Sequence, residues 1–449
     1  MFNITSCKRV LIRAVLILGL LAISSLSFAQ TPNVVGEVRA YKAESPHPYP
    51  SGDANRPVVW RDVVVSPHAE FLRLHFRGFA LASGDYVTVS NPDGSDFWVY
   101  EGRGSKGTGD FWSFAVQGDT AIVELHGGPR NSNGYHIDAL GHGSRQIGRP
   151  SATPEVVCGG TDGREDIACH SGSTIPPVYE RPVANLLFVS GPFLFSCTGW
   201  LIDGDNNSTL ITNNHCISKQ GEVDSLQASF NDQWTVCDGD TLNDIESYAG
   251  GDLLITNKID RRGRKGGLDY SLLTLLGNPE DTWGELKASI SAVNISDKIW
   301  FIQHPRGDPK EVGYYEDEDH ATRCKVDTIN ETYGNSAPGS QVGYACDSEG
   351  GSSGSPIIFD SGSDPRYAVA LHHFGGVDNG CLNSGTSMAD ICADAGSLLN
   401  CNGVTPPPPP PPPEQCINPG GLDVRESCSS NAECCSDKCK GKPGSKTCK

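Results

Sequence analysis

Three polar side chains stand beside apolar stretches in a way that suits nucleophilic chemistry. His215 follows the strand-like run 209–212, Asp269 opens the apolar run 270–275, and the small-residue stretch 350–356 places three serines before another apolar strand. A serine hydroxyl can attack a carbonyl carbon once an imidazole removes its proton, and a carboxylate can orient that imidazole. These residue types therefore predict acyl transfer.

The order of these residues narrows the class of hydrolase. Histidine, aspartate and serine follow one another as in chymotrypsin-type enzymes, whereas subtilisins and α/β-hydrolases use two other orders. The serine stretch also lacks the G-x-S-x-G elbow of α/β-hydrolases, because Ser355 stands where the final glycine is needed.

The strands around the histidine contain two cysteines that could hold it in place. Residues 195–202 and 209–216 read as two strands joined by a polar turn; the first contains Cys197 and the second ends in the histidine and Cys216. A Cys197–Cys216 disulfide would clamp the histidine loop to its neighbouring strand. A carboxylate that enters an apolar strand needs a hydrogen-bonding partner. The histidine could be that partner for Asp269; the alternative is an aspartate that only begins a strand.

Three motifs resemble the active-site motifs of trypsin-like, chymotrypsin-fold serine peptidases: TNNHC at 212–216, GLDYSLL at 267–273 and GGSSGSP at 350–356. Further segments are closest to bacterial lysyl endopeptidases, namely 157–158, 162–167, 303–307 and 370–376. The resemblance covers roughly residues 156–400. It implies an all-β fold with a chymotrypsin-like double β-barrel, and an endopeptidase that works through an acyl-enzyme intermediate.

The same resemblance assigns the catalytic roles. Of the three serines, Ser353 aligns with the nucleophile, although the other two are rivals on residue type alone. His215 is expected to act as general base and then general acid, and Asp269 to fix its tautomer. The backbone amides of Gly351 and Ser353 are expected to form the oxyanion hole, where one donor is typically worth about 3 kcal/mol of barrier.

Two positions depart from the pattern of the family. Chymotrypsin-like zymogens mature when a new N-terminus pairs with an aspartate just before the nucleophile, but Ser352 occupies that position here. Activation by an inserted ammonium group is therefore not expected, and removal of the preceding domain would relieve occlusion or aid export instead. Asn213 and Asn214 replace the small residues that often precede the histidine, which should not abolish activity.

Two signals compete for the residue recognised before the scissile bond (P1). His373, ahead of Gly375 and Gly376, resembles the pocket histidine of glutamyl endopeptidases, although lysyl endopeptidases also carry a histidine before a Gly-Gly pair. Asp390, nine residues beyond Cys381, resembles the acid that binds a P1 lysine. A buried carboxylate there would select a cationic P1 by charge pairing, so Lys or Arg is favoured over Glu. The alternative role for Asp390 is a helix N-cap.

Disulfide pairs follow from the same resemblance. It implies Cys197–Cys216 and Cys158–Cys237, and Cys324–Cys346 is a plausible local pair ahead of the serine loop. Four further cysteines stay unassigned: Cys169, Cys381, Cys392 and Cys401.

The rest of the chain divides into further modules. Residues 1–29 read as a secretory signal with a basic region, an apolar core and a small-x-small cleavage site. Residues 31–145 contain short strands between Gly, Asp and Pro turns, which predicts a β-sandwich accessory or pro-domain. The peptidase domain is expected over 155–402, and the proline run within 403–414 predicts an extended linker.

Residues 415–449 hold six cysteines and too little apolar surface for a core, so cross-links must stabilise this module. It resembles a knottin, and that resemblance implies the pairs Cys416–Cys435, Cys428–Cys439 and Cys434–Cys448. Spacing alone leaves fifteen pairings open. The basic far end of the module is either a solvated surface or a face for a surface or polymer ligand.

Composition limits the partners of this chain. A net charge of −19 argues against nucleic-acid binding. The even number of cysteines beyond the signal favours disulfides over metal sites, and neither a metal cluster nor a cofactor is expected. No later segment is apolar enough to cross a membrane, so we expect a secreted, extracellular or periplasmic protein that acts on proteins or peptides. A catalytically inactive, secreted binding protein with a protease fold is the alternative from another class.

Overall fold

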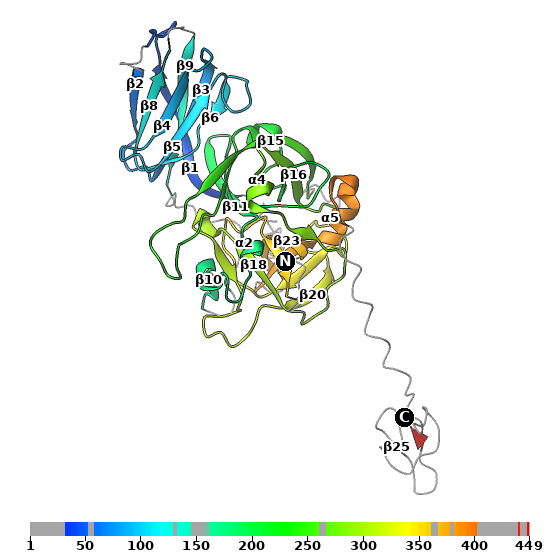
Figure 1. Cartoon of the computed structure of the whole chain (residues 1–449). Helices are drawn as coiled ribbons and strands as arrows, with labels where there is room; N and C mark the ends of the chain where they lie inside the picture. The colour runs from blue at the N-terminus through cyan, green and yellow to red at the C-terminus, as the bar shows by residue number, and fades with distance from the viewer. Residues whose placement is uncertain are drawn as a thin grey trace, which may run out of the picture. The chain divides into compact units, whose positions relative to one another are not determined.

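The computed structural model is built almost entirely from β-strands (Figure 1). It describes residues 32–52, 58–128, 133–144, 157, 161–259, 266–360, 367–377 and 381–401, and the backbone of 439–440 and 447–448. By its contacts the chain forms two units, Met1–Cys401 and Asn402–Lys449. Among the described residues, no helix is long and apolar enough to span a membrane.

The first nine strands form a β-sandwich, as the alternating sequence predicts. One sheet has the order β1-β9-β3-β6 with β7 beside β3, and the other has the order β2-β8-β4-β5. Alternate residues of each strand enter a shared apolar core, as the pattern of β8 illustrates. The strands are β1 (Asn33–Glu44), β2 (Val58–Val65), β3 (Phe71–Ala80), β4 (Tyr86–Ser90), β5 (Phe97–Glu101), β6 (Asp110–Trp112), β7 (Val116–Gln117), β8 (Thr120–His126) and β9 (Gly134–Gly143).

Strand β1 belongs to the sandwich and to the next domain at once. Its first residues pair antiparallel with β12 (Phe193–Leu201), and the rest of the strand pairs with β9. The fully buried guanidinium of Arg73 also crosses this junction, because it donates to the carbonyls of Ser113, Leu187 and Ser225. Backbone pairing and a buried cation therefore join the sandwich to the following domain.

A closed six-stranded barrel follows, drawn in green in Figure 1. Its order is β11-β14-β15-β16-β13-β12, and pairing between β11 and β12 closes the ring. Besides β12 its strands are β11 (Val183–Ser190), β13 (Thr209–Thr212), β14 (Gln227–Phe230), β15 (Glu246–Asn257) and β16 (Tyr270–Leu275). All residues of β13 and most of β16 are buried, including the two threonines of β13 and the serine of β16.

A second sheet with the order β10-β19-β18-β22-β23-β24-β21-β20 and with β17 beside β23 contains the other barrel. An isolated bridge between Lys298 and Lys325, the residues just before β18 and β20, brings these two strands together and closes the barrel. Its strands and those beside it are β10 (Arg164–Asp166), β17 (Lys287–Ala288), β18 (Ile299–Gln303), β19 (Glu311–Gly313), β20 (Val326–Glu331), β21 (Gln341–Tyr344), β22 (Pro356–Phe359), β23 (Tyr367–Val377) and β24 (Leu382–Ser387). The expected all-β, chymotrypsin-like double barrel is thus confirmed.

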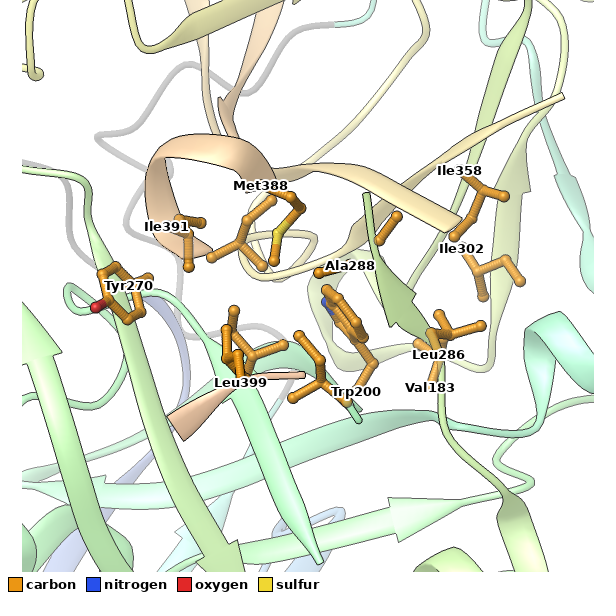
Figure 2. Packing of buried hydrophobic residues seen from close by; sticks show 14 of the residues in the cluster. Val183, Trp200, Tyr270, Leu286, Ala288, Ile302, Ile358, Met388, Ile391 and Leu399 are labelled. Atoms are coloured by element: carbon orange, nitrogen blue, oxygen red, sulfur yellow. The ribbon is translucent and has the colours of Figure 1, made fainter. Parts of the chain in front are cut away.

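Short helices occupy the connections and the end of the second barrel. They are η1 (Ile167–Cys169), α2 (Pro177–Glu180), α3 (Gln220–Asp224), α4 (Pro279–Trp283), η2 (Pro305–Gly307), α5 (Met388–Ala395) and η3 (Gly396–Leu398). One apolar cluster joins the two barrels. Figure 2 shows Met388 and Ile391 of α5 near Trp200 of the first barrel and Ala288 beside the second. This cluster holds the two barrels in one fixed arrangement.

Four disulfides lie within the described residues. The Cys197–Cys216 and Cys324–Cys346 bonds are present as expected. The pairing Cys158–Cys237 is wrong, because Cys237 bonds to Cys169. Cys169 lies in η1, eleven residues beyond Cys158, and two nearby cysteines cannot be told apart by spacing alone. The fourth disulfide, Cys392–Cys401, joins α5 to the end of the domain.

Several predicted features lie outside the described residues. They include the signal, the proline linker, Cys158 and most of the knottin-like module. In that module the structure gives two short antiparallel strands, β25 (Cys439–Lys440) and β26 (Thr447–Cys448), in which Cys439 and Cys448 face one another in register. The predicted cystine pairs of the module stay predictions.

Candidate active site

Asp269 lies directly before β16 and is almost completely buried in the first barrel. Its φ of 52° is in the left-handed region, which aspartate tolerates better than most residues. The side chain of buried Asn213 stabilises this turn, since its Nδ2 donates to the Asp269 carbonyl at 2.9 Å. The asparagine that departs from the family pattern therefore has a structural role beside the carboxylate.

His215 contacts both oxygens of the Asp269 carboxylate. Its backbone N–H donates to Oδ1 at 3.0 Å, and its Nδ1 lies 2.8 Å from Oδ2. A proton held on Nδ1 leaves the lone pair on Nε2. Nε2 is buried and has no hydrogen-bond partner among the described residues. The imidazole is therefore held in the tautomer that can accept a proton.

The Asp269 carboxylate is held in its ionised form. Burial alone would raise its pKa, but the charges and hydrogen bonds of His215 and His373 outweigh burial and lower the pKa. A buried carboxylate stays charged at this position because the backbone N–H and Nδ1 of His215 and the Nδ1 of His373 contact it.

His373 is the third group on this carboxylate, a position the sequence analysis did not foresee. Its Nδ1 lies 3.2 Å from Asp269 Oδ2, and its Nε2 lies 2.5 Å from Oε1 of Gln341. The side chain is completely buried, and burial lowers its pKa. Both ring nitrogens contact protein groups, which argues against the predicted contact between His373 and a P1 carboxylate.

The serine stretch crosses from the second barrel to the strand that carries Cys197. Thr198 N donates to the Ser353 carbonyl at 2.9 Å, and Cys216 Sγ lies 3.9 Å from the same oxygen. Ser353 is thus placed against the residue that follows His215. Gly354 N in turn donates to the His372 carbonyl of β23 at 2.9 Å. The backbone of Ser353 therefore lies beside the His215–Cys216 segment, where the two barrels meet.

The loop conformation requires glycine at two positions. Gly351 has a φ of 107°, and a Cβ there would lie 2.7 Å from the His304 carbonyl oxygen. Gly354 has a φ of 94°, and a Cβ there would lie 2.0 Å from the Thr198 carbonyl oxygen. Side chains would be both strained and blocked at these positions.

Three amides of this loop hold its turn and cannot serve an oxyanion. Ser352 N donates to the Glu349 carbonyl, Gly354 N to the His372 carbonyl, and Ser355 N to the Ser352 carbonyl. The hydroxyl of Ser352 is buried and donates to Gln303 Oε1 at 2.6 Å. A neutral bond thus occupies the place of the ion pair that forms when chymotrypsin-like zymogens mature.

The predicted pocket residues lie on the second barrel. Gly375 and Gly376 form an irregularity in the pairing of β23 with β24, and Gly376 has a φ of 72°. Asp390 is half-buried in the first turn of α5. The alternative N-cap role for Asp390 is wrong, because the N-cap of α5 is Ser387. No hydrogen bond or ion pair of the Asp390 side chain occurs among the described residues.

One group of side chains outside this site could bind a metal ion. Glu44, His47 and His136 of the sandwich place their ligand atoms within 4.8 Å of one another. Glu44 and His47 are close in the chain but His136 is far from them, so no sequence motif marks this group. His136 Nδ1 lies 3.1 Å from a Glu44 oxygen, and the two histidine rings stack. These contacts also account for the cluster without a metal.

His304 contacts the serine loop and should make stability depend on pH. Burial and the charge of Lys310 lower the pKa of His304 from 6.5 to about 3. Between these values the unfolded chain binds a proton that the folded chain does not bind, so stability falls as the pH falls. We predict that His304 alone lowers the free energy of unfolding by about 2 kcal/mol from about pH 7 to about pH 5. Urea unfolding of wild type and His304→Asn measures this, and equal pH slopes would contradict it.

Several solved peptidase structures are similar to this chain at low identity. A Glu endopeptidase is 21% identical with a TM-score of 0.36, covering 53% of this chain and 96% of that one. The protease Anisep from Arthrobacter nicotinovorans is 16% identical with a TM-score of 0.36, covering 50% of this chain and 93% of that one.

Comparisons of the sequence match a relative and a family model over a half or more of this chain. The secreted RxLR effector protein 73 of Plasmopara viticola is 32% identical over 336 residues, covering 72% of this chain and 79% of its own length. A family model described as the lysyl endopeptidase C-terminal domain matches residues 161–391, about half of this chain. The chain therefore belongs to the lysyl endopeptidase C-terminal domain family.

Proposed function

We propose that this protein is an exported serine endopeptidase that hydrolyses peptide bonds through Ser353, His215 and Asp269. The observation that carries the proposal is the buried Asp269–His215 pair, in which both carboxylate oxygens accept from one histidine. This pair directs Nε2 away from the carboxylate. The backbone of Ser353 lies against the neighbouring Cys216.

The proposed reaction has two halves. His215 Nε2 removes the proton of Ser353 Oγ as this oxygen attacks the peptide carbonyl. The imidazolium that forms is stabilised by Asp269 and then gives its proton to the leaving amine. Water repeats these steps on the acyl-enzyme and releases the second product.

The developing oxyanion needs donors on rigid backbone. We assign this role to the amides of Gly351 and Ser353, since the three other amides of the turn donate within the protein. The glycine at 351 supports this assignment, because its φ of 107° and the close His304 carbonyl fix the direction of that peptide.

We further propose cleavage after Lys or Arg. Membership of the lysyl endopeptidase C-terminal domain family supports a cationic P1. Asp390 supplies a half-buried carboxylate on α5, directly after β24. The alternative, recognition of Glu by His373, is disfavoured because Asp269 and Gln341 occupy both nitrogens of that ring.

The proposal also covers the location of the protein and the roles of its N-terminal and C-terminal modules. Four disulfides in the described residues and a relative named as a secreted protein support an extracellular location. We propose the sandwich, residues 31–145, as a retained part of the enzyme, because β1 pairs with β12. The C-terminal module, 415–449, is proposed as a knottin that binds a surface or polymer ligand.

A serine-directed fluorophosphonate probe tests the assignment of the nucleophile. Wild type should be labelled at Ser353 and should cleave peptides, whereas Ser353→Ala should lose labelling and at least about 10³-fold in kcat. Ser355→Ala is the matched control; it loses one buried hydroxyl bond to the Ser352 carbonyl and should keep labelling.

Two outcomes would overturn the proposal. Labelling that persists in Ser353→Ala would remove the nucleophile assignment. The folded wild type could also show neither labelling nor turnover, both as the full chain and after removal of residues 31–145. That result would favour a catalytically inactive binding protein.

A mixed peptide library tests the pocket. Wild type should cleave after Lys or Arg, and Asp390→Asn should lose about 100-fold in kcat/KM for these peptides with a much smaller change for neutral P1 residues. An unchanged preference in Asp390→Asn would refute the role of Asp390. A native preference for Glu would point back to His373.

A further inference from the structure

The start of the peptidase domain inserts beneath the serine loop. Strand β10 pairs with β19, with Arg164 opposite Gly313. The preceding residue, Gly163, donates its buried amide to Asp347 Oδ2 at 2.7 Å. A Cβ at Gly163 would lie 2.7 Å from the backbone nitrogen of Asp317, so only glycine fits this path.

Arg164 contacts a carboxylate of the serine loop from this inserted segment. Its side chain is only 4% exposed, and Nη2 lies 2.7 Å from Glu349 Oε2. Asp162 and Glu311 surround the same guanidinium. Burial alone would lower the pKa of Arg164, but these carboxylates outweigh it and raise the pKa. Removal of the guanidinium would leave three carboxylates close together with less counter-charge.

Glu349 transmits this contact to the turn that carries the nucleophile. Its carbonyl accepts the Ser352 amide at 3.0 Å, and the next residue, Gly350, accepts from the amide of Arg306 at 2.6 Å. The Arg306 side chain also contacts Glu349, but it is 51% exposed. Solvent weakens such an exposed pair, so Arg164 is the stronger anchor.

We propose that Arg164 is a positioning residue that replaces the inserted N-terminal ammonium of activated chymotrypsin-like enzymes by holding Glu349 and the serine loop from within the chain. This rests on the proposed function for its catalytic consequence. Because Arg164 is internal, the loop is assembled without a new chain end. The enzyme therefore needs no cut ahead of residue 161 to become active.

Kinetics of the full chain test the proposal. Arg164→Gln should lower kcat about 10- to 100-fold while KM changes less than about threefold, because the loop and not the substrate pocket is displaced. Glu349→Gln should give a similar loss, and the double variant should lose little more. Arg164→Lys should recover part of kcat.

The matched control is Arg323→Gln, which breaks a 2.7 Å pair with Asp360 elsewhere in the second barrel and should keep wild-type kcat. Intact-mass analysis should show full turnover by uncleaved chains. Activity that appears only after cleavage ahead of residue 161 would overturn the proposal.

Hydrogen exchange separates this proposal from the proposed function. In Arg164→Gln the amides of Ser352, Gly354 and Ser355 should exchange at least about tenfold faster than in wild type, with the barrel strands unchanged. If wild type proves inactive, the proposed function fails and exchange alone decides the role of Arg164. Wild-type kcat together with unchanged exchange would overturn the role. If Arg164→Gln fails to fold, Arg164→Lys and Glu349→Gln supply the same comparison.

Discussion

The buried carboxylate of Asp269 is the interaction on which the rest of the site depends. An isolated carboxylate would be strongly destabilised in this position. Two N–H groups of His215 and one ring nitrogen of His373 compensate for burial and keep the group ionised. The same bonds orient the imidazole, so the feature that stabilises the charge also fixes the geometry needed for proton transfer.

The two barrels must keep a fixed relation for this arrangement to work. Asp269 and His215 belong to the first barrel, whereas Ser353 lies between β21 and β22 of the second. The apolar cluster around Trp200 and the Thr198–Ser353 backbone bond connect the two sides. Rigid packing around this small polar centre allows the serine loop to keep its glycines in the left-handed region. It also keeps the backbone amides of that loop in fixed directions.

The sequence predicted what depends on local motifs and failed where long-range contacts decide. Polar residues beside apolar strands pointed to His215, Asp269 and the serine stretch. The alternation of apolar and polar residues predicted the sandwich. Nothing local shows that His373 reaches Asp269, 104 residues away. Similarly, Cys158 and Cys169 were equally able to reach Cys237 by spacing. The sequence also could not show that β1 pairs with strands of two domains, because strand pairing depends on the partner and not on the strand alone.

Turnover of Asp269→Asn, compared with wild type on one peptide substrate, tests the central claim most directly. An amide at this position can donate to His215 and thereby favour the wrong tautomer, while the fold around it is kept. The account predicts a fall in kcat of about 10⁴-fold in a variant that stays folded. A folded variant within about tenfold of wild-type kcat would show that the buried carboxylate does not organise catalysis.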